Sequence, residues 1–122
     1  MIELLQTLKL MFDQVTKESY LEINNSEKIN YPYLTYSLDI DNINRNTDGF
    51  YLDIDIFDEN SSFINIFNLE SLLRENFDFN QKFTDGLFLR FYFQRSFSVA
   101  TQSDTLKRRN LQIYCKVDWR NK

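Results

Sequence analysis

The sequence predicts an α+β fold, in which two helices pack on one face of an antiparallel four-stranded sheet in the order α-β-β-α-β-β. Two stretches repeat apolar residues at helical spacing, and four others alternate apolar and polar residues at strand spacing. The four strand-like stretches form two consecutive pairs, which is typical of antiparallel hairpins. With 122 residues, the chain has the length of one such domain, so we expect a single domain over 1–122.

The first predicted helix covers residues 2–16. Its apolar residues recur every three or four positions and form one stripe: Leu4, Leu5, Leu8, Met11, Phe12 and Val15. A polar loop over 24–30 precedes an extended segment, 31–40, because Pro32 disfavours the helical conformation at Tyr31. The even positions of this segment are predicted to face the core: Leu34, Tyr36, Leu38 and Ile40.

The clearest strand follows a loop over 41–49 that is rich in Asn and Asp. It covers 50–57 and places four apolar residues on one face: Phe50, Leu52, Ile54 and Ile56. Four residues after it offer caps to the next helix: Asp58, Asn60, Ser61 and Ser62. That second helix is predicted over 61–78, with an apolar stripe of Phe63, Ile66, Phe67, Leu69, Leu72, Leu73 and Phe77.

Two long strands complete the predicted sheet. The first covers 87–99, after a turn at Asp85-Gly86. Its apolar phase, by which we mean the apolar side chains that share one face of the strand, consists of Leu87, Leu89, Phe91, Phe93 and Phe97. A polar linker, 100–105, leads to the last strand. There Arg109 precedes an apolar phase of Leu111, Ile113, Cys115, Val117 and Trp119.

Composition excludes several classes of function. The chain has no His, so mechanisms that need an imidazole base or ligand are excluded, and its one cysteine, Cys115, provides neither a disulfide nor a zinc site. Cys115 shares the apolar phase of its strand and is expected to be buried and inert. No signal-peptide pattern or membrane-spanning apolar run occurs, so we expect synthesis in the cytoplasm and no membrane contact. No catalytic or cofactor-binding motif is recognised, and an enzyme is not expected.

Two acidic residues are the first candidates for a binding site. Asp53 and Asp55 project from the same strand face, roughly 7 Å apart at the usual rise per residue. Such a pair can hold Mg²⁺ or Ca²⁺, with Asp39 or Asp41 on a neighbouring strand. A solvated or ion-paired outer face explains them more simply, so the sequence predicts no metal site.

The basic triplet Lys107-Arg108-Arg109 opens the last strand and raises the question of nucleic-acid binding. Consecutive side chains of a strand diverge, so these cations do not form one groove. A nucleic-acid module would use Arg90, Arg108 and Arg109 with Tyr92. The net charge of −4, from 14 cations and 18 acids, opposes general phosphate binding. Cross-strand ion pairs and subunit contacts explain the mixture better.

The outer face of the predicted sheet has the composition of an interface. With 12 Phe and 7 Tyr, the chain carries more aromatic residues than a small core hides. Aromatic and charged residues alternate on this face, and a monomer seldom exposes so much aromatic surface. The outer face is therefore predicted to be a self-association surface. The predicted subunit or partner contacts are Asp53, Asp55, Arg90, Tyr92, Arg95, Asp104, Lys107, Arg108, Arg109 and Tyr114.

The order of these elements resembles a family of phage proteins. An amphipathic helix is followed by "YPYLTYSL" (31–38), "GFYLDIDIFDENSS" (49–62), a capped helix, a long strand with Arg95 near its end, and "DTLKRRNLQIYCKV" (104–117). This arrangement is similar to the tail-terminator, or tail-completion, proteins of long non-contractile-tailed bacteriophages. Members are often described as minor capsid or head–tail joining components, and the resemblance covers nearly the whole chain.

The resemblance implies a structural role in the virion. Such proteins form a six-fold ring on the head-proximal end of the tail tube, stop tube polymerisation and offer a surface to the head-side connector. DNA passes through without being gripped. The basic triplet would then contact neighbouring subunits or the tube, with Asp53, Asp55 or Asp104 of a neighbour as partners. Two alternatives remain: another neck component, such as a connector stopper, and a nucleic-acid-binding module.

Overall fold

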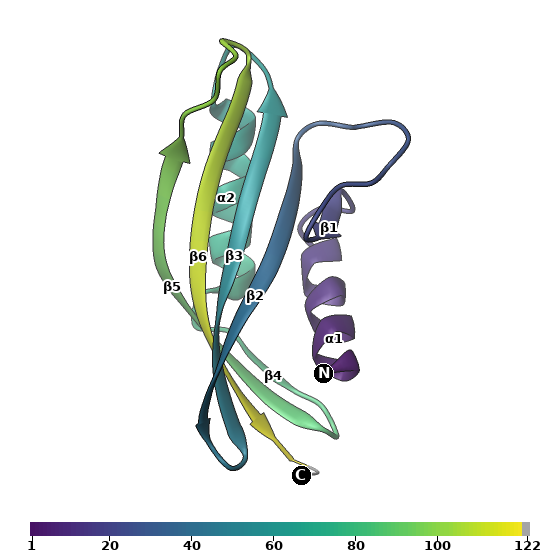
Figure 1. Cartoon of the computed structure of the whole chain (residues 1–122), viewed down its shortest axis with the longest axis vertical. Helices are drawn as coiled ribbons and strands as arrows, with labels where there is room; N and C mark the ends of the chain where they lie inside the picture. Colours follow the sequence, from purple (N-terminus) through teal and green to yellow (C-terminus); the bar gives the residue numbers. More distant parts are fainter. Residues whose placement is uncertain (121–122) are drawn as a thin grey trace.

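The computed structural model describes residues 1–120 as two helices and six strands (Figure 1). In chain order they are α1 (Ile2–Asp13), β1 (Ser19–Leu21), β2 (Tyr33–Asn44), β3 (Thr47–Glu59), α2 (Ile64–Phe77), β4 (Gln81–Phe83), β5 (Leu87–Val99) and β6 (Leu106–Trp119).

The strands form one mixed sheet that curls into a half-barrel, in the order β1-β2-β3-β6-β5-β4 (Figure 1). Strand β1 pairs with β2 in parallel, and the other four pairings are antiparallel. The predicted antiparallel four-stranded sheet was therefore wrong in strand number and in strand direction. The four long strands were identified, but the two edge strands were missed.

The missed edge strands are too short to produce an alternation signal. Both β1 and β4 have three residues, fewer than the four to eight over which alternation identifies a strand. Strand β1 also depends on a neighbour that is distant in sequence, because Ser19 aligns with Leu34, whereas β4 pairs across a short turn, where Phe83 aligns with Phe88. Only the folded sheet brings β1 and β2 together in parallel.

The first hairpin is also longer than predicted. Residues 41–49 were expected to form a loop, but β2 continues to Asn44 and β3 begins at Thr47. The Asn42 side chain donates hydrogen bonds to the Asn44 carbonyl and to Asp48, each at 2.8 Å. Polar residues therefore extend the ladder beyond the apolar core.

Both helices are shorter than predicted. Helix α1 ends at Asp13 and α2 begins at Ile64, where the Ser62 hydroxyl accepts a hydrogen bond from the Ile64 amide at 3.1 Å. Asp58, one of the proposed caps, instead lies within β3 and is 2% exposed.

A single core joins both helices to one face of the sheet. In the register of the central strands, Leu52 aligns with Ile113, and Phe91 aligns with Cys115, so their apolar phases coincide. Helix α1 contributes Phe12, which stacks on a β2 ring, and α2 contributes Phe77, which packs against Phe12 and Phe91. The ring centroids of Phe12 and Tyr36 are 4.2 Å apart. We call the opposite face of the sheet the outer face.

A bulge at Gln94 reverses the phase of β5. Phe93 aligns with Ile113 and Arg95 with Gln112, so Gln94 has no partner of its own. Phe97, which was predicted to face the core, therefore aligns with Asn110 on the outer face and is 36% exposed.

Cys115 is fully buried in this core, as predicted. Burial raises the pKa of its thiol well above the ordinary value, because the surrounding apolar side chains cannot solvate a thiolate. The native thiol is therefore protected twice, by lack of access and by protonation.

We expect Cys115 to resist a disulfide exchange reagent in native buffer at pH 8 and to react fully in denaturant. Absorbance of the released thiolate would measure the reaction, with Cys115→Ser as the blank. Rapid stoichiometric labelling of the native protein would contradict the buried position.

Candidate assembly surfaces

The basic triplet does not form a patch. Its side chains point alternately to the core side and to the outer face of β6, because Lys107 aligns with Asp58, Arg108 with Phe57 and Arg109 with Ile56. Each cation lies over a different ring, at centroid distances of 5.4, 5.5 and 4.9 Å for Lys107 over Phe63, Arg108 over Phe57 and Arg109 over Phe67. The three cations therefore serve three separate contacts.

Arg109 ties the sheet to α2. Its Nε lies 2.5 Å from the Glu70 carboxylate, and the two side chains are only 15% and 11% exposed. Its remaining nitrogens donate to the hydroxyls of Ser96 and Ser98, each at 3.0 Å. These serines reach the core side because the Gln94 bulge changed the phase of β5. The predicted contact residue Arg109 thus has partners within its own chain.

Asp53 and Asp55 lie together on the outer face and share one neighbour. The Asn110 amide nitrogen donates to Asp53 at 2.7 Å and to Asp55 at 3.1 Å. Arg108 adds an ion pair to Asp55 at 3.2 Å. The two carboxylates are thus bridged by an amide and one is paired with a guanidinium, which is the ion-paired outer face that the sequence favoured. Among residues 1–120, no three acidic or cysteine side chains gather as a metal site would require.

Aromatic residues of the outer face pack in pairs. Tyr51 and Tyr114 have ring centroids 5.1 Å apart, and Tyr33 stacks on Phe57 at 4.9 Å. The Tyr114 hydroxyl lies so close to Gly49 that a Cβ at this position would collide with it. Burial against these neighbours raises the pKa of Tyr33. Pairing covers part of this aromatic surface, although Tyr51 stays 44% exposed.

A groove on the outer face brings together two of the predicted contact residues, Asp53 and Arg95. It is also lined by Asp39, Tyr51, Gln94 and Gln112. Arg95 is exposed and stacks over Phe97 at 4.6 Å, with no ion pair to the described residues. The bulged Gln94 helps to shape this groove, and no local sequence pattern revealed it.

The other predicted contact residues lie towards the two ends of the sheet. Arg90 pairs with Asp118 at 2.8 Å, and Tyr92 contacts the Phe79 ring edge-on at 6.3 Å. At the opposite end, the Lys107 amine donates to the Asp104 carbonyl at 2.6 Å. The structure therefore distributes the ten predicted residues over the outer face, the β5–β6 end and the α2 contact.

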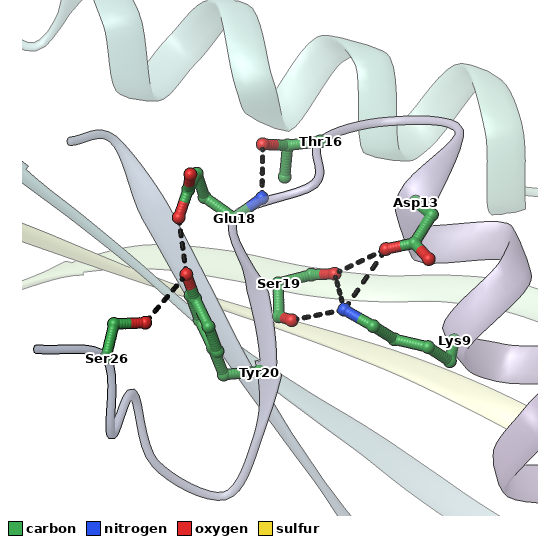
Figure 2. Close-up of polar contacts among 7 residues, drawn as sticks. All are labelled: Lys9, Asp13, Thr16, Glu18, Ser19, Tyr20 and Ser26. Atoms are coloured by element: carbon green, nitrogen blue, oxygen red, sulfur yellow. Dashed lines mark hydrogen bonds and ion pairs between the residues drawn. The ribbon is translucent and has the colours of Figure 1, made fainter. Parts of the chain in front are cut away.

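The sequence missed a polar corner that holds α1 against β1 (Figure 2). The Lys9 amine donates to the Ser19 carbonyl at 2.5 Å and forms an ion pair with Asp13 at 3.1 Å. Nearby, the Tyr20 hydroxyl donates to Glu18, and this hydrogen bond to the carboxylate raises the pKa of Tyr20. These interactions depend on the position of β1, a strand that the sequence did not predict.

An apolar groove lies beside this corner, between α1 and β1. Its volume is about 810 Å³. Its lining is mainly apolar and includes Ile2, Leu5, Leu10, Leu21 and Tyr36. We call it the α1–β1 groove. Neither α1 nor α2 is long and apolar enough to cross a membrane, within the part of the chain described.

Among the solved structures that share this fold is one that matches nearly the whole chain. It is a chain of the virion of a native gene transfer agent (GTA) particle, with a TM-score of 0.70 and 11% sequence identity. The match covers 89% of the present chain and 84% of that chain. No protein-family model and no curated protein matches the sequence. At such low identity, the likeness demonstrates a common fold.

We expect Arg109→Met to lower the free energy of unfolding by about 3 kcal/mol, because it leaves the Glu70 carboxylate buried without its partner. Arg108→Met is the matched control, since its ion pair is more exposed and contributes about 0–1 kcal/mol. Urea unfolding followed by circular dichroism would compare the two variants. Equal losses would show that Arg109 does not anchor α2.

Proposed function

We propose that this chain is a structural virion protein of the phage head–tail junction. It forms a ring that caps the tail tube, stops tube polymerisation and provides the surface for head attachment. The observation that carries the proposal is the fold, which the chain shares over nearly its full length with a virion component. The order of its sequence motifs, which resembles the tail terminators, supports the same conclusion independently. The ring would be a homohexamer without enzymatic activity.

The outer face is the proposed surface for the tail-tube and head–tail connector proteins. It presents paired aromatic rings among charges, and aromatic residues and Arg are enriched at protein interfaces. The proposed contacts there are Asp53, Asp55, Arg90, Tyr92, Arg95, Arg108 and Tyr114, with Asp104 and Lys107 at the β5–β6 end. Arg109 acts indirectly by holding α2 on the sheet.

Nucleic-acid binding has less support. Its three proposed cations, Arg90, Arg108 and Arg109, each have a carboxylate partner within the chain. Phosphate would have to displace these partners in a protein of net charge −4. These ion pairs and the negative net charge are consistent with the proposal that DNA passes through the ring without being bound by it.

Removing the chain from a particle-producing host is expected to yield tails of uncontrolled length and heads without tails. The physical reason is that nothing would then occupy the growing end of the tube. Electron microscopy of released particles would measure tail length, with the chain resupplied from a plasmid as the control. Tails of normal length beside free heads would instead favour another neck component. Normal complete particles would refute a virion role.

Arg95→Glu is expected to preserve the fold but to reduce the yield of complete particles. Arg95 is exposed beside the outer-face groove, so reversing its charge changes the surface without removing an ion pair. Lys28→Glu, in the exposed loop between β1 and β2, makes the same charge change elsewhere. Each variant would be supplied to a host that lacks the chain, and complete particles would be counted by electron microscopy to compare the two yields. Equal particle yields from both variants would exclude Arg95 as a contact.

A further inference from the structure

We propose that neighbouring copies of the chain join head to tail, with the β4 edge of one copy seated in the α1–β1 groove of the next. The inference rests on the proposed ring and names its seam. We call residues 78–84, which include Phe79 and Phe83, the β4 edge. The rings of Phe79 and Phe83 lie against Tyr92 and Phe88 at the β4 end of the outer face, so the seam takes up that end and the rest of the outer face stays available for the tube and the connector.

The α1–β1 groove needs an apolar occupant. Two side chains of its lining, Ile2 and Leu10, are 68% and 67% exposed, and Leu21 is 41% exposed. Exposed aliphatic groups gathered in one groove gain about 25 cal/mol for every Å² of surface that a partner covers. The opening is thus suited to an inserted ring or aliphatic side chain.

The β4 edge offers rings of this kind. Phe79 and Phe83 are 78% and 65% exposed, more than any other aromatic side chain among the described residues. Phe79 also has a left-handed backbone, with φ of 57°, which is uncommon for a bulky residue. Hydrogen bonds from the Phe79 amide to the Phe91 carbonyl and from the Phe93 amide to Asp78 hold this conformation. The exposed Phe79 ring, which contacts only the edge of Tyr92 among the rings, is therefore carried by a backbone conformation that costs energy, and such conformations cluster at functional sites.

Opposite charges accompany the two surfaces. Glu22 follows β1 directly and is exposed, and Lys82 is the central residue of β4. Neither side chain has an ion-pair partner within residues 1–120. If β4 lies along β1 of a neighbour, these two charges can pair across the seam and fix its direction.

The contact is made by side chains and does not extend the sheet. The Ser19 carbonyl of β1 already accepts from Lys9, as Figure 2 shows, and the Leu21 carbonyl accepts from the Ile23 amide at 2.8 Å. Both outward acceptors of this edge are therefore occupied, which protects it from uncontrolled strand addition. Because the groove and the β4 edge are different surfaces, their contact is heterologous, and such contacts close into rings when the rotation allows.

Two complementary variants test this seam. Phe79→Ser with Phe83→Ser removes the inserted rings, and Leu10→Asp with Leu21→Asp makes the groove polar. We expect each double variant alone to be monomeric by native mass spectrometry, with association at least roughly tenfold weaker than in the wild-type chain. Mixed together, they retain one intact groove and one intact β4 edge. The mixture is therefore expected to form a 1:1 dimer and nothing larger.

Controls separate this seam from the proposed function. Leu72→Asp, on the exposed side of α2, is expected to assemble like the wild-type chain, and circular dichroism would verify that every variant folds. Rings formed by either double variant would overturn the seam and leave the virion role intact. Folded double variants that stay monomeric when mixed would overturn it too, as would a wild-type chain that never self-associates. The virion role would in each case still be decided by tail lengths in particles.

Discussion

The structure depends on one constraint: the apolar phases of β3, β6 and β5 coincide on a single face of the sheet. Their register aligns Leu52 with Ile113 and Phe91 with Cys115, and this face cannot stay in water. Helices α1 and α2 cover it, with Phe12 and Phe77 in direct contact beneath β2. Each fully buried Leu, Ile or Phe contributes about 1.5–3 kcal/mol, whereas an exposed ion pair contributes about 0–1 kcal/mol. Burial of the core therefore contributes most of the stability of the fold, and the exposed ion pairs contribute little.

The Gln94 bulge divides the long β5 strand into two parts, whose inward-facing side chains differ. Before the bulge, β5 sends apolar side chains into the core; after it, Ser96 and Ser98 face inward and surround Arg109. The core side of the sheet thus ends in a polar cluster, where the guanidinium of Arg109 meets the Glu70 carboxylate of α2. The same change of phase turns Arg95 and Phe97 outward and shapes the outer-face groove.

The proposed ring would need a fold that is stable without its partners and surfaces that remain for them. Both helices here serve one face of the sheet, so the outer face and the two sheet edges are left for contacts. The two edges of the sheet present different surfaces. One carries an apolar groove beside a strand whose carbonyls are occupied, and the other carries exposed phenylalanines. Two different edges allow a directional contact, and directional contacts are what rings require.

The sequence by itself determined the two helices, the four long strands and most of the buried face, because spacing along the chain fixes which side chains share a side. Four residues predicted on the apolar faces are instead exposed: Ile40, Phe67, Leu72 and Phe97. It also favoured an ion-paired outer face for Asp53 and Asp55. The edge strands, the bulge and the α1–β1 groove were decided only by the tertiary structure. Three residues such as Ser19, Tyr20 and Leu21 become a strand because β2 lies beside them, and Phe97 turns outward because Gln94 has no partner in β6. These features arise from strand pairing and packing that no local pattern of the sequence indicates.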